Sequence, residues 1–266
     1  MDKRLAFIGG GNIAQAILSG LVPTLDNPRA IIVADPSDEQ GLRCQALGAT
    51  WTQDNPTAVT GADVVLLCVK PQLMEAVAGA LSGQLEGRLI ISVAAGITAA
   101  QLSHWCGTDN VIRSMPNTPA LVGQGMLGLY AAPSVSEEDR TLANELLSTV
   151  GVTRWFPDEH DLDAVTAVSG SGPAYFFYLM EAMIASAQSL GLTAEAAREL
   201  VTQTALGAAT MTNQPGANPA ALRAQVTSPN GTTHAACEAL KLGGFEDLVD
   251  RALQAARDRS IELSAP

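Results

Sequence analysis

The stretch Leu5-Ala6-Phe7-Ile8-Gly9-Gly10-Gly11-Asn12-Ile13-Ala14 contains the pattern G-x-G-x-x-A directly after four apolar residues. The apolar run predicts a buried strand, and apolar residues at helical spacing over residues 12–21 predict a helix that ends before Pro23. Glycines at such a turn let a diphosphate approach the N–H groups at the start of the helix. The stretch therefore favours a dinucleotide-binding turn over a turn that is glycine-rich for steric reasons alone.

Strand-like and helix-like segments alternate after this turn. Buried-strand patterns occupy residues 30–34, 63–69, 89–94 and 111–114, and two more strand patterns occupy residues 125–130 and 151–156. Helical patterns occupy residues 37–47, 72–81 and 98–105, and Ser136 is a suitable N-cap for a further helix. This alternation predicts a parallel sheet covered by helices on both faces. We expect the sheet domain to end near Pro157.

The second half of the chain contains helical patterns. They are alanine-rich and occupy residues 174–190, 194–212, 218–226, 230–242 and 245–263. The predicted fold is an α/β, Rossmann-like dinucleotide-binding domain over residues 1–157, followed by an all-α C-terminal dimerisation domain over residues 158–266. The apolar helices and the aromatic run Tyr175 to Tyr178 offer more apolar surface than one small bundle covers, so we expect at least a dimer.

The composition argues against nucleic-acid and membrane partners. The chain has 15 Lys and Arg against 27 Asp and Glu, a formal net charge of −12 that a phosphate backbone or an anionic membrane would repel. No run reaches the roughly 18 apolar residues of a membrane span, and residues 1–7 are too short for the apolar part of a signal peptide. Cys44, Cys68, Cys106 and Cys237 lack C-x-x-C spacing, so free thiols and a cytoplasmic location are expected.

Charged residues follow two of the predicted strands. Asp35 follows the second strand, where a carboxylate accepts from a ribose hydroxyl and favours NAD, although Asp35-Pro36-Ser37 is equally typical of a helix cap. Both interpretations stay open. Val69-Lys70-Pro71 and Ala94-Ala95-Gly96 follow two later strands, at the sheet edge where ligands bind in parallel α/β folds. Lys70 is therefore expected to contact phosphate or ribose.

The segment Thr227-Ser228-Pro229-Asn230-Gly231-Thr232-Thr233 predicts an anion site. With Ser228 as the N-cap and Pro229 as the first helical residue, the N–H groups of Asn230, Gly231 and Thr232 would be unpaired. Glycine in a first helical turn costs roughly 0.5–1 kcal/mol relative to alanine, and close approach of a small carboxylate would explain that cost.

Several motifs occur in an order and spacing that are specific to one enzyme family. They are Phe7 to Asn12, Val69 to Pro71, Arg113-Ser114-Met115-Pro116-Asn117-Thr118-Pro119, Asp163 to Thr166, Ser169 to Tyr175 and Thr227 to Thr233. Together they closely resemble the pyrroline-5-carboxylate reductase family over essentially the whole chain. The resemblance implies reduction of the imine of 1-pyrroline-5-carboxylate to proline by hydride from NADPH or NADH. It also implies homodimers assembled into a decameric ring.

The resemblance also implies the site residues. For the cofactor they are Ile8, Gly9, Gly10, Gly11, Asn12, Ile13, Asp35, Pro36, Ser37, Asn55, Cys68, Val69, Lys70, Pro71, Val93, Ala94, Ala95 and Gln225. For the substrate they are Glu159, Ser228, Gly231, Thr232 and Thr233. Many relatives have a basic or amide residue where this chain has Asp35, so the acid leaves the choice between NADPH and NADH open.

The imine needs a hydrogen-bond donor near its nitrogen, and Thr233 is the expected donor. A threonine hydroxyl is too weak an acid to protonate the nitrogen, so its expected role is orientation and polarisation, with water completing proton transfer. His234 is the alternative acid, but consecutive helical residues face about 100° apart. A metal on His234 and Cys237 would lack further ligands, and no metal is expected.

Two other functions compete with this one. β-Hydroxyacid dehydrogenases share the architecture but use a lysine and an asparagine one helical turn apart, whereas Lys241 in the helical half is followed four residues later by Phe245. A protein that binds the nucleotide to report redox state would bind cofactor without turnover.

Overall fold

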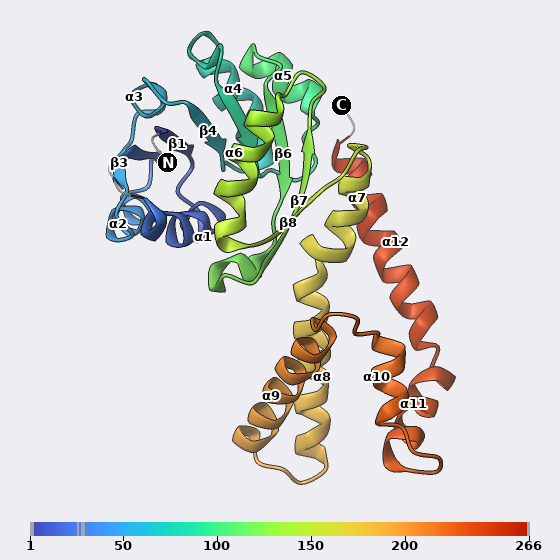
Figure 1. The fold of residues 1–266 in the computed structure, drawn as a ribbon. Helices are drawn as coiled ribbons and strands as arrows, with labels where there is room; N and C mark the ends of the chain where they lie inside the picture. Colours follow the sequence, from blue (N-terminus) through green and yellow to red (C-terminus); the bar gives the residue numbers. More distant parts are fainter. Residues whose placement is uncertain (1–2, 26, 28–29, 265–266) are drawn as a thin grey trace. The chain divides into compact units, whose positions relative to one another are not determined.

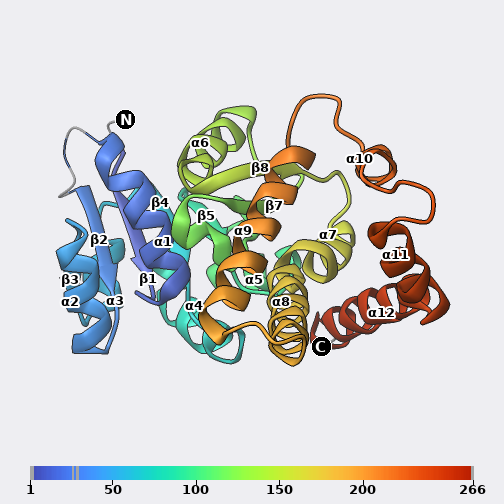
Figure 2. The ribbon, with the colours of Figure 1, turned by 90° about the horizontal axis from the view of Figure 1, so that it is seen from below.

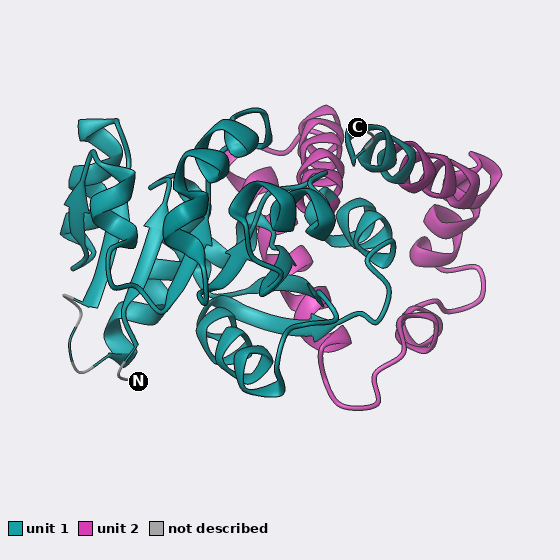
Figure 3. Cartoon of the chain, turned by 90° about the horizontal axis from the view of Figure 1, so that it is seen from above, with its two compact units in different colours: residues 1–171, 256–266 teal, residues 172–255 magenta. Residues whose placement is uncertain are grey.

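The structure is a computed structural model that describes residues 3–25, 27 and 30–264. The chain divides into two compact units (Figure 3): Met1–Ser171 with Ala256–Pro266 forms unit 1, and Gly172–Ala255 forms unit 2. The outer limits of the predicted domains, at residues 1–2 and 265–266, lie outside the described residues. The last strand ends at Trp155, whereas the units divide after Ser171, so the domain limits at residues 157 and 158 stay a prediction.

Unit 1 is built on a sheet with helices between its strands (Figure 1). The strands are β1 (Leu5–Ile8), β2 (Ile31–Ala34), β3 (Thr50–Thr52), β4 (Val64–Leu67), β5 (Leu89–Ser92), β6 (Val111–Met115), β7 (Gly125–Ala131) and β8 (Gly151–Trp155). The helices are α1 (Asn12–Leu21), α2 (Asp38–Ala46), α3 (Asn55–Val59), α4 (Pro71–Leu85), α5 (Ala99–Cys106), α6 (Glu137–Leu147) and α7 (Asp161–Val165). These bounds confirm the predicted α/β class.

The strand order is β3-β2-β1-β4-β5-β6-β7-β8. Figure 2 shows the end of the sheet with β2 and β3 on the left of the view and the end with β7 and β8 nearer its middle. β1 pairs in parallel with both β2 and β4, with Leu5 opposite Ile31 on one side and Val64 on the other. The chain moves outward from β1 in one direction and from β4 in the other, so right-handed crossovers place α1 and α2 on one face and α4 and α5 on the other. The carboxyl ends of β1 and β4 therefore flank the point where the order reverses, which is the ligand crevice of such folds.

Burial on both faces explains why these strands are continuous apolar runs. Every residue of β1 and of β4 is buried, and the side chains of the two strands belong to one hydrophobic core. A strand that faced solvent on one side would alternate polar and apolar residues instead.

The sheet is not parallel throughout. β7 runs antiparallel to β6, and β8 is parallel to β7. The connection at residues 116–124 contains only a 3₁₀ turn (Thr118–Val122), which is too short for the crossover that a parallel pair requires. α6 then supplies a crossover between β7 and β8. The predicted parallel sheet is confirmed from β1 to β6, whereas the direction of β7, which the sequence patterns left open, is antiparallel.

Sequence patterns missed the shortest elements. β3 and α3 are too short to show periodicity, and α7 with the π turn that continues it (Thr166–Gly170) lies in a segment for which the sequence patterns predicted no individual helix. In that turn the N–H of Ser171 donates to the carbonyl of Thr166 at 2.8 Å, and a Cβ on Gly170 would lie 2.4 Å from Met115. Glycine therefore allows the π turn to contact β6.

Unit 2 is helical, as predicted. It contains α8 (Gly172–Ser189), α9 (Ala194–Thr212), α10 (Pro219–Gln225), α11 (Thr232–Leu242) and the first part of α12 (Phe245–Ser264), whose last part belongs to unit 1. α8 and α9 pack against each other. In unit 1, the end of α12 is held by a hydrogen bond of 2.7 Å from the hydroxyl of Ser260 to the carboxylate of Asp163. None of the helices in the described part of the chain has the length and apolar character that a membrane crossing requires.

Unit 2 leaves much of its apolar surface exposed. Phe176, Phe177 and Tyr178 in α8 expose 64%, 62% and 74% of their surface, whereas the large apolar side chains of β1 are fully buried. An apolar groove of about 710 Å³ is lined by residues of α8 and α9, among them Leu179, Met183 and Val201. Apolar surface of this extent is typical of a subunit interface.

We expect Gly41→Ala to lower the free energy of unfolding by roughly 1–3 kcal/mol, because a Cβ at Gly41 would lie 2.0 Å from the indole of Trp51. Gly79→Ala in α4 is the control, since an added Cβ there meets nothing within 4 Å. It should raise the free energy of unfolding by about 0.4–1 kcal/mol. Denaturant unfolding of the three proteins measures both changes, and equal effects would contradict the packing of α2 on Trp51.

Candidate functional site

The glycine turn after β1 lies against the end of β4. Gly9 has a φ of +98°, and an added Cβ would lie 2.8 Å from the backbone carbonyl of Cys68. The N–H of Gly9 donates to the carbonyl of Ala34 at 2.8 Å, which ties the turn to β2 as well. Glycine is required here both for the backbone conformation and for the close approach of two strands.

The start of α1 presents unpaired donors at this turn. Gly11 is the N-cap, no side chain caps the helix, and a Cβ on Gly11 would meet nothing within 4 Å. The N–H groups of Asn12, Ile13 and Ala14 have no acceptor within the helix, and the helix dipole adds positive potential at this end. The open space and free donors suit a diphosphate.

Asp35 is held firmly beside the turn. Its Oδ2 accepts from the N–H of Gly10 at 2.7 Å, its Oδ1 accepts from the N–H of Ser37 at 2.8 Å, and its carbonyl accepts from the indole N–H of Trp51 at 3.0 Å. The N-cap of α2 is Ser37, not Asp35. Asp35 thus braces the glycine turn against the start of α2, and its contact with a ribose stays a prediction.

The remaining residues predicted to bind the cofactor divide between the two units. Lys70 is an exposed N-cap of α4 and Pro71 is its first residue, at the carboxyl end of β4. Val93 to Ala95 follow β5, with the N–H of Val93 donating to the carbonyl of Leu67 at 3.1 Å, and Asn55 begins α3 after β3. Unit 1 therefore gathers most of the predicted set at one sheet edge. Gln225 ends α10 in unit 2, and its part in cofactor binding stays a prediction.

Unit 1 contains three thiols, of which Cys44 and Cys68 lie against the glycine turn. Cys44 Sγ lies 3.6 Å from the carbonyl of Gly10, and burial, with a smaller effect of the Asp35 charge, raises the pKa of Cys44 to about 11. Burial likewise raises the pKa of Cys68 to about 12 and that of Cys106 to about 11. These thiols are protonated at neutral pH, so they serve as apolar packing groups.

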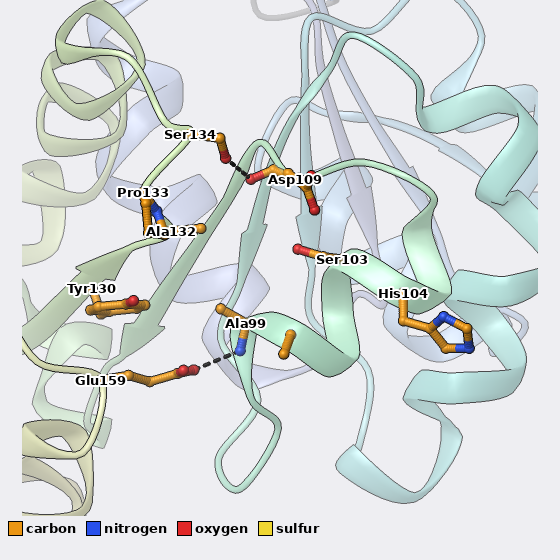
Figure 4. Close-up of a pocket in the computed structure, with 10 residues that line it drawn as sticks. Ala99, Ser103, His104, Asp109, Tyr130, Ala132, Pro133, Ser134 and Glu159 are labelled. Carbon is orange, nitrogen blue, oxygen red and sulfur yellow. Dashed lines mark hydrogen bonds between the residues drawn. The ribbon is translucent and has the colours of Figure 1, made fainter.

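Glu159 makes two short contacts inside unit 1. Its Oε1 accepts from the N–H of Ala99 at the start of α5 at 2.6 Å (Figure 4). The same oxygen accepts from Nη1 of Arg113 at 2.7 Å. The Arg113 side chain is only 9% exposed, so the guanidinium of this ion pair is nearly buried, whereas the Glu159 side chain is 23% exposed. Glu159 lies at the rim of a cavity of about 590 Å³, together with Tyr130, His104 and residues 132–134.

Sequence patterns alone did not identify the roles of Arg113 and Asn117. Asn117 donates from Nδ2 to the carbonyl of Ser169 at 3.0 Å and accepts at Oδ1 from the N–H of Met126 at 2.9 Å. This amide links the Met-Pro-Asn-Thr-Pro segment to the Ser-Gly-Ser-Gly segment, fifty-two residues apart. Because the two segments lie far apart in the sequence, no local pattern identified the contact between them.

The predicted start of α11 was wrong by three residues. Residues 228–231 form a turn in which Pro229 precedes Asn230 at a φ of +58° and the N–H of Gly231 donates to the carbonyl of Ser228 at 3.0 Å. These are the features of a type II turn. Gly231 is the N-cap, so the N–H groups without helical acceptors belong to Thr232, Thr233 and His234.

The reason for Gly231 also differs from the expected one. An added Cβ would lie 2.5 Å from the hydroxyl oxygen of Ser228 and 3.1 Å from its carbonyl oxygen. Glycine is therefore needed for contact with Ser228 inside the turn, which places the Ser228 hydroxyl close to the start of α11.

The two candidate donors lie on different sides of α11. His234 lines a polar cavity of about 460 Å³ within unit 2, together with Arg223, Cys237 and Lys241, whereas Thr233 is not among its lining residues. Throughout the described ranges, no group of three or more His, Cys, Asp or Glu side chains is arranged to hold a metal.

We expect Glu159→Ala to lower the free energy of unfolding by roughly 2–4 kcal/mol, because it leaves the nearly buried Arg113 without its counter-charge and Ala99 without its acceptor. Glu137→Ala is the control, since the Glu137 side chain is 92% exposed and lies 3.5 Å from Arg140. Glu137→Ala should change the free energy of unfolding by no more than about 0.5 kcal/mol. If Glu159→Ala lowers the free energy of unfolding no more than Glu137→Ala does, the pair of Glu159 and Arg113 has no structural role.

The comparisons with known proteins agree with both halves of the chain. The family model for pyrroline-5-carboxylate reductase dimerisation matches residues 159–263, and that for NADP oxidoreductase, coenzyme F420-dependent, matches residues 4–96. The pyrroline-5-carboxylate reductase of Pseudomonas aeruginosa is 49% identical over 98% of this chain and 97% of its own length. That of Haemophilus influenzae is 44% identical over the same shares.

A solved structure matches over its full length. The pyrroline-5-carboxylate reductase of Coxiella burnetii superimposes with a TM-score of 0.93 at 38% identity, covering 100% of both chains. The chain belongs to the pyrroline-5-carboxylate reductase family.

Proposed function

We propose that this protein reduces the imine of 1-pyrroline-5-carboxylate to L-proline by hydride transfer from NADPH or NADH, the last step of proline synthesis. The observation that carries the proposal is the relative from Pseudomonas aeruginosa, which is 49% identical across both units and is named for this reaction. The glycine turn and the start of α11 supply the two anion sites that such a reaction needs.

The residues at the sheet edge fit a dinucleotide. The N–H groups at the start of α1 face open space beyond Gly11 and would take the diphosphate, with Lys70 nearby as an exposed cation. Asp35 and Ser37 lie beside the glycine turn, in position for the adenosine ribose. When bound, the reduced nicotinamide supplies the hydride.

The substrate carboxylate would lie at the start of α11. Ser228 offers a hydroxyl, and Thr232 and Thr233 offer N–H groups at the positive end of the helix dipole. Gly231 keeps the turn compact against Ser228. The family resemblance also assigns Glu159 to the substrate, and its Oε2 has no hydrogen-bond partner within the described ranges that would prevent this role.

Thr233 is the proposed donor to the imine nitrogen. A hydrogen bond to nitrogen makes the C=N carbon a better hydride acceptor, and a fixed hydroxyl stabilises the developing charge without reorganisation. Because the hydroxyl is a weak acid, water delivers the proton that the product nitrogen retains. Thr233 therefore orients and polarises the imine.

The assembly follows from the exposed apolar helices. We propose a homodimer through unit 2, supported by the match to the dimerisation model and by the exposure of Phe176 to Tyr178. We also propose that the dimers assemble into a decamer. A further proposal is that the protein is located in the cytoplasm. Sedimentation of a stable 27.5 kDa monomer at micromolar concentration would contradict the dimer.

The proposed activity is tested by following the oxidation of NADPH and of NADH with and without pyrroline-5-carboxylate. We expect oxidation only when the imine is present, with proline as the product. Saturable cofactor binding without turnover would indicate a nucleotide-sensing protein instead.

Thr233→Ala should lower kcat by about 10²-fold and leave cofactor affinity unchanged, because it removes one transition-state donor. Thr233→Ser, which keeps the hydroxyl, should retain most of the activity. Near-normal kcat in Thr233→Ala combined with complete loss in His234→Ala would show that His234 is the donor.

Asp35→Ser and Asp35→Asn should both shift the ratio of kcat/KM values toward NADPH by about tenfold, since each removes a negative charge that repels a 2′-phosphate. Asparagine keeps one acceptor for the N–H groups of Gly10 and Ser37, so it separates the effect of charge from loss of the turn. An unchanged ratio in both variants would show that Asp35 only braces the turn.

A further inference from the structure

The turn before α11 contains Asn230-Gly231, the only Asn-Gly pair in the sequence. Asn230 is exposed, and it is the one residue other than glycine that has a positive φ within the described ranges. Its side-chain amide has no hydrogen-bond partner in the part of the chain that the structure describes. An unrestrained asparagine amide next to a glycine N–H is chemically labile.

We propose that Asn230 is a site of spontaneous deamidation that impairs the substrate segment as the protein ages. The nitrogen of Gly231, after losing its proton to solvent base, forms a bond to Cγ of Asn230. The bond from Cγ to Nδ2 breaks, and ammonia leaves with a proton from water. Water then opens the cyclic imide at one of its two C–N bonds and yields aspartate or isoaspartate, with no change of oxidation state.

Other asparagines in the chain are protected in ways that Asn230 is not. Asn27, Asn55 and Asn218 precede proline, which has no N–H to attack with. The amide of Asn117 is fixed by Ser169 and Met126, and Nδ2 of Asn110 donates to Asp139 at 3.0 Å. Gly231 has no side chain of its own to hinder its nitrogen, which within the described residues donates a hydrogen bond to the carbonyl of Ser228 at 3.0 Å.

Either product places a new negative charge directly before the N-cap of α11. The helix dipole tolerates this charge, so the fold should persist. Isoaspartate in addition inserts a backbone atom into the turn that Ser228 and Gly231 close. On the proposed function, the same helix end binds the substrate carboxylate, so the modified protein should bind substrate less well and cofactor as before.

The test is to incubate the purified, assembled protein in warm, mildly alkaline buffer and to follow two readouts over time. Tryptic cleavage after Arg223 and Lys241 releases a peptide whose only asparagine is Asn230. Its mass reports replacement of NH by oxygen, and its chromatographic separation distinguishes isoaspartate. KM for pyrroline-5-carboxylate and affinity for NADPH are measured on the same samples.

We expect Asn230 to convert well ahead of Asn213, an exposed asparagine before glutamine that serves as the internal reference. Asn230→Asp should show an about tenfold higher KM for substrate from the start. Asn230→Gly, which adopts the left-handed conformation freely and has no amide to lose, should keep its KM throughout the incubation.

If Asn230 deamidates no faster than Asn213, it is not a preferred site of deamidation. If Asn230 deamidates fully and KM for pyrroline-5-carboxylate stays unchanged, deamidation does not impair substrate binding. An equal rise of KM in aged Asn230→Gly would lead to the same conclusion. The mass measurement needs no activity, so absence of turnover in fresh protein contradicts the proposed function alone.

Discussion

The architecture of unit 1 depends on the contact between the Gly9 turn and the end of β4. The left-handed backbone at Gly9 brings the chain so close to β4 that an added Cβ would lie 2.8 Å from the carbonyl of Cys68. This approach keeps β1 and β4 adjacent where the strand order reverses, and it aims the start of α1 across that edge. Any side chain at Gly9 would separate the strands and turn the N–H groups at the start of α1 away, so the fold and the proposed cofactor site depend on the same constraint.

The two units contribute differently to the protein. Unit 1 buries continuous apolar strands in its own core, whereas unit 2 exposes aromatic and aliphatic side chains of α8 and α9. Each unit nevertheless contains a helix whose N-cap is glycine and whose first N–H groups have no acceptor within the helix. On the proposed function, backbone donors at these two helix ends would bind a diphosphate and a substrate carboxylate in a protein with a net charge of −12.

Sequence patterns predicted what depends on long periodic segments. β1, α1, α9 and α11 are long or apolar enough to show their period. Most of the residues that the family resemblance assigns to the cofactor follow strands whose ends were recognisable. The direction of β7 depended on the length of one connection, and the start of α11 depended on whether Pro229 opens a helix or a turn. The positive φ of Asn230 makes this segment a turn. The conformational preferences of proline alone allow either a turn or the start of a helix. The bonds of Asp35, Glu159 and Asn117 join residues far apart in sequence, so no local pattern could predict them.

The most direct test of this account is a crystal structure of the protein with oxidised cofactor and proline bound. The account predicts the diphosphate at the N–H groups of Asn12 and Ile13. It also predicts the proline carboxylate within hydrogen-bond distance of the N–H groups of Thr232 and Thr233. A proline carboxylate held instead by Arg223 or Lys241, in the cavity that His234 lines, would contradict the claim that backbone donors bind the substrate.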